Sequence, residues 1–327
     1  MAAAPLVPIA VGFLALVALV VASGVVVERL LALATHFEVP DALVGLFVLS
    51  IGTSLPEIGT HVIASTGILA GRLDYAVTSA TVIGGNMGSS TTQQLLLVAL
   101  FLVSVGHVTV ASDFARNGVL PMIGALVLTL AVAADGTLGR LDGAVLLLAF
   151  AAYAVYSFAR RERSQALPES ESAGALVDSV VAAGGLLVVL VAAFVVLSTV
   201  ELVVTRLAFG GSMLGLVTIG IASALPELST VLESIRRQTP NLALGTLVGS
   251  NVVNPLVGIG LGSAISTYAV PDALLLWDLP FKIVAGVGFL AVLYWGPNNE
   301  LDRRTGAALL ILYFVYLVGR LVLFPGE

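Results

Sequence analysis

Long apolar segments follow one another along the chain, separated by short turns that contain charged residues, glycine or proline. A membrane-spanning helix needs about 20 predominantly apolar residues, and segments of about that length recur from one end to the other. They predict helices over residues 5–33, 42–70, 75–105, 116–133, 141–158, 176–209, 213–236, from Pro240 onward, 277–294 and 305–324. The expected fold is an all-α polytopic membrane protein with ten transmembrane helices.

One hydrophilic stretch interrupts this series. Residues 160–175 begin with arginines and have an acidic middle, which is typical of a linker rather than of a domain. The predicted organisation is a first five-helix repeat over residues 1–159, the linker over 160–175 and a second five-helix repeat over 176–327. Because five is an odd number, the second half enters the membrane from the opposite face. The expected architecture is therefore a pair of inverted-topology repeats.

Composition supports a membrane protein with little soluble mass. Of 327 residues, 58% are hydrophobic and only 10% are charged, and the mean hydropathy is +1.08, outside the range of soluble folds. The absence of cysteine excludes disulfides and thiol chemistry. The net charge of −6 is spread over short loops and indicates no nucleic-acid partner. The expected partners are the lipid bilayer and small inorganic cations, and no protein partner is evident.

The basic residues suggest an orientation. One face of the predicted topology carries Arg116, Arg160, Arg161, Arg163, Arg236, Arg237, Arg303 and Arg304, and the other carries Arg72, Arg140, Arg206, Lys282 and Arg320. The positive-inside rule then predicts a plasma-membrane protein with a cytoplasmic central linker and both termini extracellular. Asp278 and Lys282 lie one turn apart on a predicted helix and are expected to pair.

A repeated motif points to the chemistry. Residues 45–60 read GLFVLSIGTSLPEIGT, and residues 215–230 read GLVTIGIASALPELST, with a shared Leu-Pro-Glu core. Proline inside a helix costs about 3 kcal/mol, and an acidic residue at the bilayer centre costs about 2.5–3.5 kcal/mol. A single kink and one paired glutamate would need no special explanation. Two matching copies in opposite halves favour a functional site near the membrane midplane.

The residues around each proline are hard oxygen ligands. Pro56 and Pro226 each leave a carbonyl one turn earlier without its helical partner. The freed carbonyls lie beside Thr53, Ser54 and Glu57 in the first copy, and beside Ser223 and Glu227 in the second. Such oxygens suit Na⁺ or Ca²⁺. Two glutamates facing each other would repel, and one Ca²⁺ would neutralise them, with hydroxyls, carbonyls or water completing its shell of six to eight oxygens.

Polar runs on the next helix of each half can supply those oxygens. They are GGNMGSSTTQQ over residues 84–94 and GSNVVNP over residues 249–255. With these motifs the chain resembles the cation/Ca²⁺ exchanger superfamily, in particular prokaryotic Na⁺/Ca²⁺ exchangers, whose two α-repeats each carry G-T-S-x-P-E followed by G-S-N-x-x-N/D. Residues 52–57 match the first element and residues 249–254 match the second.

The resemblance implies a function and a set of ligands. It implies a secondary active antiporter that exchanges Ca²⁺ for Na⁺ by alternating access, largely through sliding of the first and sixth helices past the core. No permanently bound cofactor is expected, since the cations are the transported substrates. The implied ligands are Thr53, Ser54, Glu57, Ser89, Ser223, Glu227, Ser250 and Asn254.

Departures from the family pattern leave the counter-ion open. Ala224 and Gly85 replace serines of the pattern, and Ser89 replaces the Asn or Asp. Fewer hydroxyls weaken Na⁺ subsites most directly. His61, one turn after Glu57, is either a structural hydrogen-bonding residue or the proton relay of a Ca²⁺/H⁺ antiporter. A non-transporting scaffold and a passive cation channel are the alternatives from other classes. No nucleophile, metal triad or phosphate loop indicates an enzyme.

Overall fold

Apolar helices make up most of the protein, as the hydrophobic pattern predicts. The computed structural model describes residues 6–36, 50–110, 114–160, 173–207, 210–237, 240–296 and 300–326. Residues 42–49 of the second predicted helix and residues 161–172 of the predicted linker lie outside this part of the chain.

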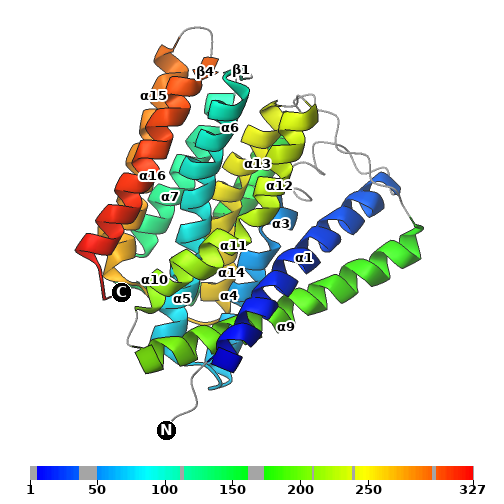
Figure 1. The fold of residues 1–327 in the computed structure, drawn as a ribbon, viewed down its shortest axis with the longest axis vertical. Helices are drawn as coiled ribbons and strands as arrows, with labels where there is room; N and C mark the ends of the chain where they lie inside the picture. Colours follow the sequence, from blue (N-terminus) through cyan, green and yellow to red (C-terminus); the bar gives the residue numbers. More distant parts are fainter. Residues whose placement is uncertain are drawn as a thin grey trace.

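Among the described residues, the elements from Ser50 to Arg160 recur in the same order from Ile221 to Leu323 (Figure 1). The first half consists of α1 (Leu6–His36), α3 (Ser50–Thr53), α4 (Leu55–Leu69), α5 (Tyr75–Thr91), η2 (Thr92–Leu97), α6 (Val98–Val105), β1 (His107–Thr109), η3 (Ala115–Val119), α7 (Leu120–Val132), β2 (Thr137–Leu138) and α8 (Arg140–Arg160). The second consists of α9 (Ala175–Leu207), α10 (Gly211–Gly215), η4 (Leu216–Gly220), α11 (Ile221–Ser223), α12 (Leu225–Arg237), α13 (Pro240–Val253), η5 (Asn254–Ile259), α14 (Gly260–Ile265), β3 (Tyr268–Ala269), η6 (Leu274–Asp278), α15 (Leu279–Trp295), β4 (Glu300–Asp302) and α16 (Arg303–Leu323).

The number of membrane helices agrees with the prediction. Nine stretches of the described residues are helical, long and apolar enough to cross a membrane. The described part of the second predicted helix, α3 together with α4, is the tenth. The chain is therefore an all-α membrane protein of ten helices.

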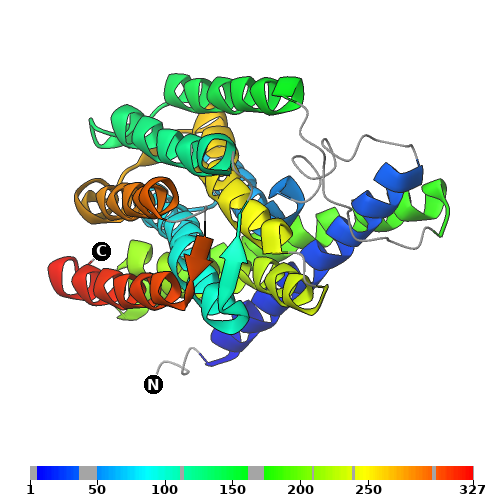
Figure 2. The same cartoon turned by 90° about the horizontal axis from the view of Figure 1, so that it is seen from above.

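The first helices of the two halves, α1 and α9, pack side by side and run in opposite directions (Figure 1). Seen from above, this pair lies at one side of the remaining helices (Figure 2). Small residues allow the close contact, since Gly185 faces Val26 and Gly12 faces Thr199. Equivalent helices that run antiparallel are the arrangement that an inverted repeat requires.

Two short antiparallel strand pairs follow the same symmetry. β1 pairs with β4, and β2 pairs with β3. β1 follows α6, and β3 follows the equivalent helix α14. β2 precedes α8, and β4 precedes the equivalent helix α16. Each pair therefore joins one strand of the first half to one strand of the second. One membrane helix separates β1 from β2 along the chain, which puts the two pairs at opposite ends of the bundle.

Several helices contain π-helical turns that the sequence analysis did not predict. η2 and η5 interrupt equivalent helices of the two halves, and η3 and η6 begin another equivalent pair. A π-helical turn adds one residue to a turn of helix and commonly lies at a functional site. The extra residue rotates the side chains that follow it around the helix axis. Beyond these turns, side chains therefore point in other directions than a regular α-helix predicts.

Glycines bring α5 into direct backbone contact with α10 and η4. A Cβ atom added at Gly215 would lie 2.0 Å from the carbonyl oxygen of Thr81, and one added at Gly84 would lie 2.0 Å from that of Ser212. A Cβ at Gly85 would lie 3.0 Å from Ile219. Close packing therefore explains glycine at position 85, where the family pattern has serine.

We expect Gly215→Ala to lower the free energy of unfolding by about 1–3 kcal/mol, because the added methyl group forces two packed helices apart. Gly124→Ala in α7 is the matched control, since nothing lies within 4 Å of its added Cβ and alanine favours the helix. Thermal unfolding of the purified variants in detergent measures both. Equal unfolding temperatures for the two variants would contradict the proposed close contact.

Candidate cation-binding site

Both Leu-Pro-Glu motifs lie at breaks between two helices, as predicted. Ser54 separates α3 from α4 with φ −85° and ψ 7°, and Ala224 separates α11 from α12 with φ −81° and ψ −2°. Proline has no N–H to donate to the preceding turn, so the helix restarts there. The nearly identical angles show that the two breaks have the same local geometry.

The two glutamates lie in the first turn after each break. Glu57 is 1% exposed and Glu227 is fully buried. Their carboxylates interact electrostatically with each other, as expected for groups related by the repeat. Each also lies at the N-terminus of a half-helix, where the backbone dipole favours negative charge. Two carboxylates in one buried site strongly attract a cation.

Each glutamate faces side chains of the opposite half. The Ser89 hydroxyl donates a hydrogen bond to Oε1 of Glu57, and Ser223 and Asn254 also face this carboxylate. The lining of the second carboxylate comes from both halves as well: Thr53 and Ser250 face Glu227, and their hydroxyls share a hydrogen bond of 3.2 Å. The site thus forms where the two broken helices cross.

Several buried polar atoms in this region form no hydrogen bond of normal geometry within the described residues. They are Ser54 Oγ, Glu57 Oε2, both carboxylate oxygens of Glu227, and Oδ1 and Nδ2 of Asn254. An uncompensated buried carboxylate is costly. Carboxylate, hydroxyl and amide oxygens are the ligands that Ca²⁺ and Na⁺ prefer. A cation among these atoms would satisfy the oxygens and offset the repulsion between the carboxylates.

The structure brings the predicted ligands together. All eight are at most 2% exposed. Two of them are the glutamates, and five face one of the two carboxylates: Thr53, Ser89, Ser223, Ser250 and Asn254. Ser54 lies in the first break, and its counterpart in the second break is the buried Ala224. No group of three His, Asp or Glu side chains occurs among the described residues, so a cation here would depend on hydroxyl and amide oxygens. The assignment of these residues as ligands stays a prediction.

Two amide side chains behind the site were not predicted. Gln93 donates to Ser89 Oγ at 3.0 Å, and Asn251 donates to Gln93 Oε1 at 3.3 Å. Both belong to the polar runs seen in the sequence. The sequence alone did not indicate these contacts. Gln93 lies in the π-helical turn η2, where the side chains no longer follow α-helical spacing.

His61 is held by a buried polar network. Asn86 Nδ2 lies 3.2 Å from His61 Nε2, and Tyr268 Oη lies 3.2 Å from Nδ1. An amide N–H only donates, so Nε2 accepts and the ring is neutral with its proton on Nδ1. Ser65 hydrogen-bonds to Tyr268 at 2.6 Å. These contacts favour the structural interpretation of His61 over a proton relay.

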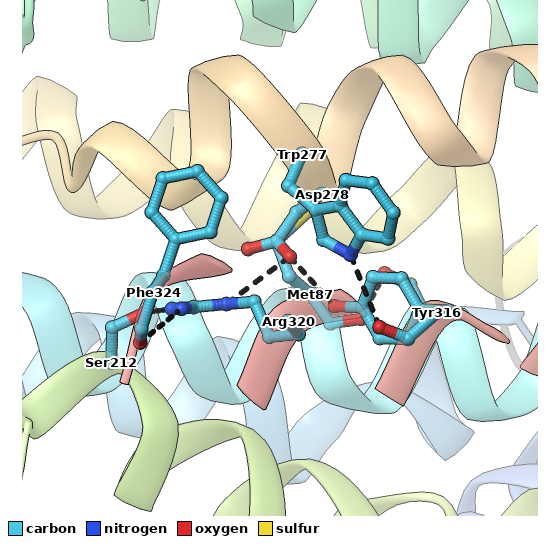
Figure 3. A network of polar contacts seen from close by, with 8 residues as sticks. Met87, Ser212, Trp277, Asp278, Tyr316, Arg320 and Phe324 are labelled. Carbon is cyan, nitrogen blue, oxygen red and sulfur yellow. Dashed lines mark hydrogen bonds and ion pairs between the residues drawn. The ribbon is translucent and has the colours of Figure 1, made fainter. Parts of the chain in front are cut away.

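A second buried polar cluster joins η6, α16 and α10 (Figure 3). Arg320 Nε lies 3.4 Å from Asp278 Oδ1, and its Nη2 donates to Ser212 at 2.7 Å. Tyr316 donates to the same Asp278 oxygen at 2.9 Å. The predicted partners Asp278 and Lys282 attract each other electrostatically, and the contacts of Asp278 with α16 are additional. The Asp278 carboxylate bonds to residues of α16, and the Lys282 ammonium points to α5 and α13.

This cluster also corrects the count of basic residues at the membrane surface. Arg320 and Lys282 are fully buried, so neither is exposed on the surface of the protein. A buried cation that is hydrogen-bonded inside the protein does not act as a topological signal. Without them, the excess of arginine on the face of the predicted linker becomes larger.

Comparison with known proteins gives one family. The family model described as sodium/calcium exchanger protein matches residues 7–159 and 179–322. The inner membrane protein YrbG of Escherichia coli strain K12 is 28% identical over 292 residues, which cover 86% of this chain and 86% of that protein.

Two solved structures have the same fold. The sodium-calcium exchanger NCX_Mj, soaked with Na⁺ and Sr²⁺, superimposes with a TM-score of 0.63 at 21% identity, over 96% of this chain and 99% of its own. The H⁺/Ca²⁺ exchanger CAX superimposes with a TM-score of 0.77 at 14% identity, over 95% of this chain and 82% of its own.

Proposed function

This chain belongs to the sodium/calcium exchanger family of cation antiporters, and from that premise we propose that it exchanges Ca²⁺ for Na⁺ across the plasma membrane. The observation that carries the proposal is the pair of buried glutamates at the two helix breaks, of which Glu57 Oε2 and both Glu227 oxygens form no hydrogen bond of normal geometry within the described residues. Two negative charges match one Ca²⁺ or two Na⁺. Both cations can then compete for the same carboxylates, which is what coupled exchange requires.

The surrounding oxygens support Na⁺ as the counter-ion. Thr53, Ser223, Ser250 and Asn254 face the carboxylates, and such neutral oxygens add ligands without adding charge. A monovalent cation therefore has places beside each glutamate. The same oxygens would complete the shell of Ca²⁺, so both cations can use one lining.

Exchange of Ca²⁺ for H⁺ is the second candidate, and one comparison favours it. The H⁺/Ca²⁺ exchanger has the higher TM-score of the two solved structures. Against it, both ring nitrogens of His61 are engaged by Asn86 and Tyr268, so His61 has no free position for a proton in transit. Proton coupling would have to use the glutamates themselves.

Sliding of α1 and α9 is our proposed route to alternating access. This pair meets α3 and α4 through glycine and valine, with Gly52 against Val27 and Gly59 against Val189. A smooth apolar interface breaks no hydrogen bonds when it shifts. Movement of the pair past the breaks could then open the site first to one side and then to the other.

The proposed orientation places the central linker in the cytoplasm and both termini outside. It rests on the arginines at positions 116, 236, 303 and 304, together with those of the predicted linker.

We expect proteoliposomes loaded with Na⁺ to accumulate ⁴⁵Ca²⁺ when diluted into Na⁺-free buffer, and to stop when monensin collapses the Na⁺ gradient. Uptake driven only by a pH gradient would identify the Ca²⁺/H⁺ antiporter instead. Entry of Ca²⁺ without any counter-gradient would indicate a channel. No Ca²⁺ movement under any gradient would contradict transport and leave the scaffold.

A further inference from the structure

Lys282 is a fully buried basic residue in the first turn of the apolar helix α15. Its ammonium donates to Ser90 Oγ and, at 3.3 Å, to Asn251 Oδ1. The Ser90 hydroxyl donates a hydrogen bond to the carbonyl oxygen of Asn86 at 2.8 Å. Its oxygen can therefore accept the hydrogen bond from Lys282. Both acceptors of the ammonium in the described part of the chain are neutral oxygens of the helices that also line the cation site.

A chain of hydrogen bonds leads from this ammonium to Glu57. Asn251 accepts from Lys282 and donates to Gln93 at 3.3 Å. Gln93 in turn donates to Ser89 at 3.0 Å, and Ser89 donates to Glu57.

All bonds of this chain point the same way. An ammonium only donates and a carboxylate only accepts, so the two ends fix the orientation of both amides and of the Ser89 hydroxyl. Aligned hydrogen bonds polarise one another. The aligned hydrogen bonds therefore join the Lys282 side chain to the carboxylate pair.

Arg320 has an acidic partner in an ion pair, whereas both hydrogen-bond acceptors of Lys282 in the described residues are neutral. Arg320 forms an ion pair with Asp278. The Asp278 carboxylate also attracts Lys282, but one carboxylate cannot neutralise two cations. When Lys282 is protonated, the cluster of Asp278, Arg320 and Lys282 therefore carries one excess positive charge, beside a site whose two ionised glutamates carry two negative charges.

The other half of the protein has no such charge at this position. η3 and η6 are equivalent, and each is followed by Leu-Pro, so Lys282 corresponds to Ile123. Ile123 is a buried apolar residue. The fixed cation is thus an asymmetric addition to an otherwise repeated site.

We propose that Lys282 is a resident cation of the ion site, which lowers the affinity of the site for each transported cation in proportion to the charge of that cation. This inference rests on the proposed cation exchange at Glu57 and Glu227. A fixed positive charge weakens binding of a divalent ion twice as much, on a logarithmic scale, as binding of a monovalent ion, because Coulomb energy is proportional to the product of the charges.

The test is cation affinity of purified Lys282→Met protein, measured by ⁴⁵Ca²⁺ binding and by its competition with Na⁺. We expect the variant to bind each Na⁺ about tenfold and Ca²⁺ about a hundredfold more tightly than wild type. Lys282→Gln keeps an N–H donor for Asn251 without the charge, and should show the same shifts if the methionine variant does not fold. Lys282→Arg keeps the charge and should stay close to wild type.

A matched control removes a positive charge elsewhere. Arg304 is exposed, so solvent screens it and Arg304→Gln should leave both affinities unchanged. Unchanged affinities in Lys282→Met and Lys282→Gln, or equal factors for Na⁺ and Ca²⁺, would overturn the role of Lys282 while leaving exchange intact. If the Ca²⁺ affinity depends on Lys282 but the protein shows no Na⁺-driven uptake, the proposed Na⁺ coupling is wrong. The proposed role of Lys282 is then still supported.

Discussion

Glu57→Gln and Glu227→Gln should each reduce Ca²⁺ uptake in proteoliposomes by at least about a hundredfold. Each substitution removes one of the two negative charges from a buried site, and a divalent ion loses more than about 2.7 kcal/mol of attraction when a contacting carboxylate becomes neutral. Glutamine has nearly the same size, so the helix break and its packing remain. The measurement is the initial rate of Na⁺-driven ⁴⁵Ca²⁺ uptake at equal protein density.

Glu28→Gln is the matched control for these two variants. The Glu28 side chain is 56% exposed and pairs with Arg29 at 3.1 Å, unlike the two buried glutamates of the site. Uptake by this variant should stay close to that of wild type. If Glu57→Gln and Glu227→Gln folded normally and transported Ca²⁺ at the wild-type rate, the assignment of the cation site would be wrong.

Arg320→Met should lower the free energy of unfolding by about 3–5 kcal/mol, the usual cost of removing one partner from a buried ion pair. Arg320 is fully buried and joins Asp278 of η6 to Ser212 of α10 (Figure 3). Without it, the buried Asp278 carboxylate loses its ion pair with the arginine and keeps the hydrogen bond from Tyr316 and the attraction of Lys282. Thermal unfolding in detergent, followed by tryptophan fluorescence, measures the loss.

The double variant Asp278→Asn with Arg320→Met distinguishes a buried charge from lost packing. Removing both charges eliminates a buried carboxylate that has lost its arginine partner, so the double variant should be more stable than Arg320→Met alone. Arg72→Met, at an exposed arginine, should change stability by less than about 0.5 kcal/mol. A double variant as unstable as the sum of both single variants would show that the ion pair does not control stability here.

Much of the fold could be predicted because the bilayer imposes strict conditions on the sequence. A spanning helix must be apolar over about 20 residues and must satisfy its own backbone, so the ten segments are visible in the hydrophobic pattern. The expected helix over residues 75–105 is found as the continuous run of α5, η2 and α6. The division into linker and repeats at residues 160–175 stays a prediction, as does the orientation in the membrane.

The candidate site was predictable because its residues violate those conditions. Pro56 and Glu57 are costly in an apolar helix, and their exact return at Pro226 and Glu227 indicates a shared task. The structure adds that each carboxylate is lined across the repeats, with Ser223 beside Glu57 and Thr53 beside Glu227.

What the sequence by itself determined is the set of helices, the inverted repeat and the paired glutamates, since each follows from local pattern and from the cost of polar groups in lipid. Only the tertiary structure decided the partners of the remaining buried polar residues. Lys282 and Asp278 are one turn apart, yet they contact different helices, because π-helical turns and glycine contacts set how the helices face each other. A side chain's neighbours across helices depend on that rotation and spacing, which no local pattern encodes.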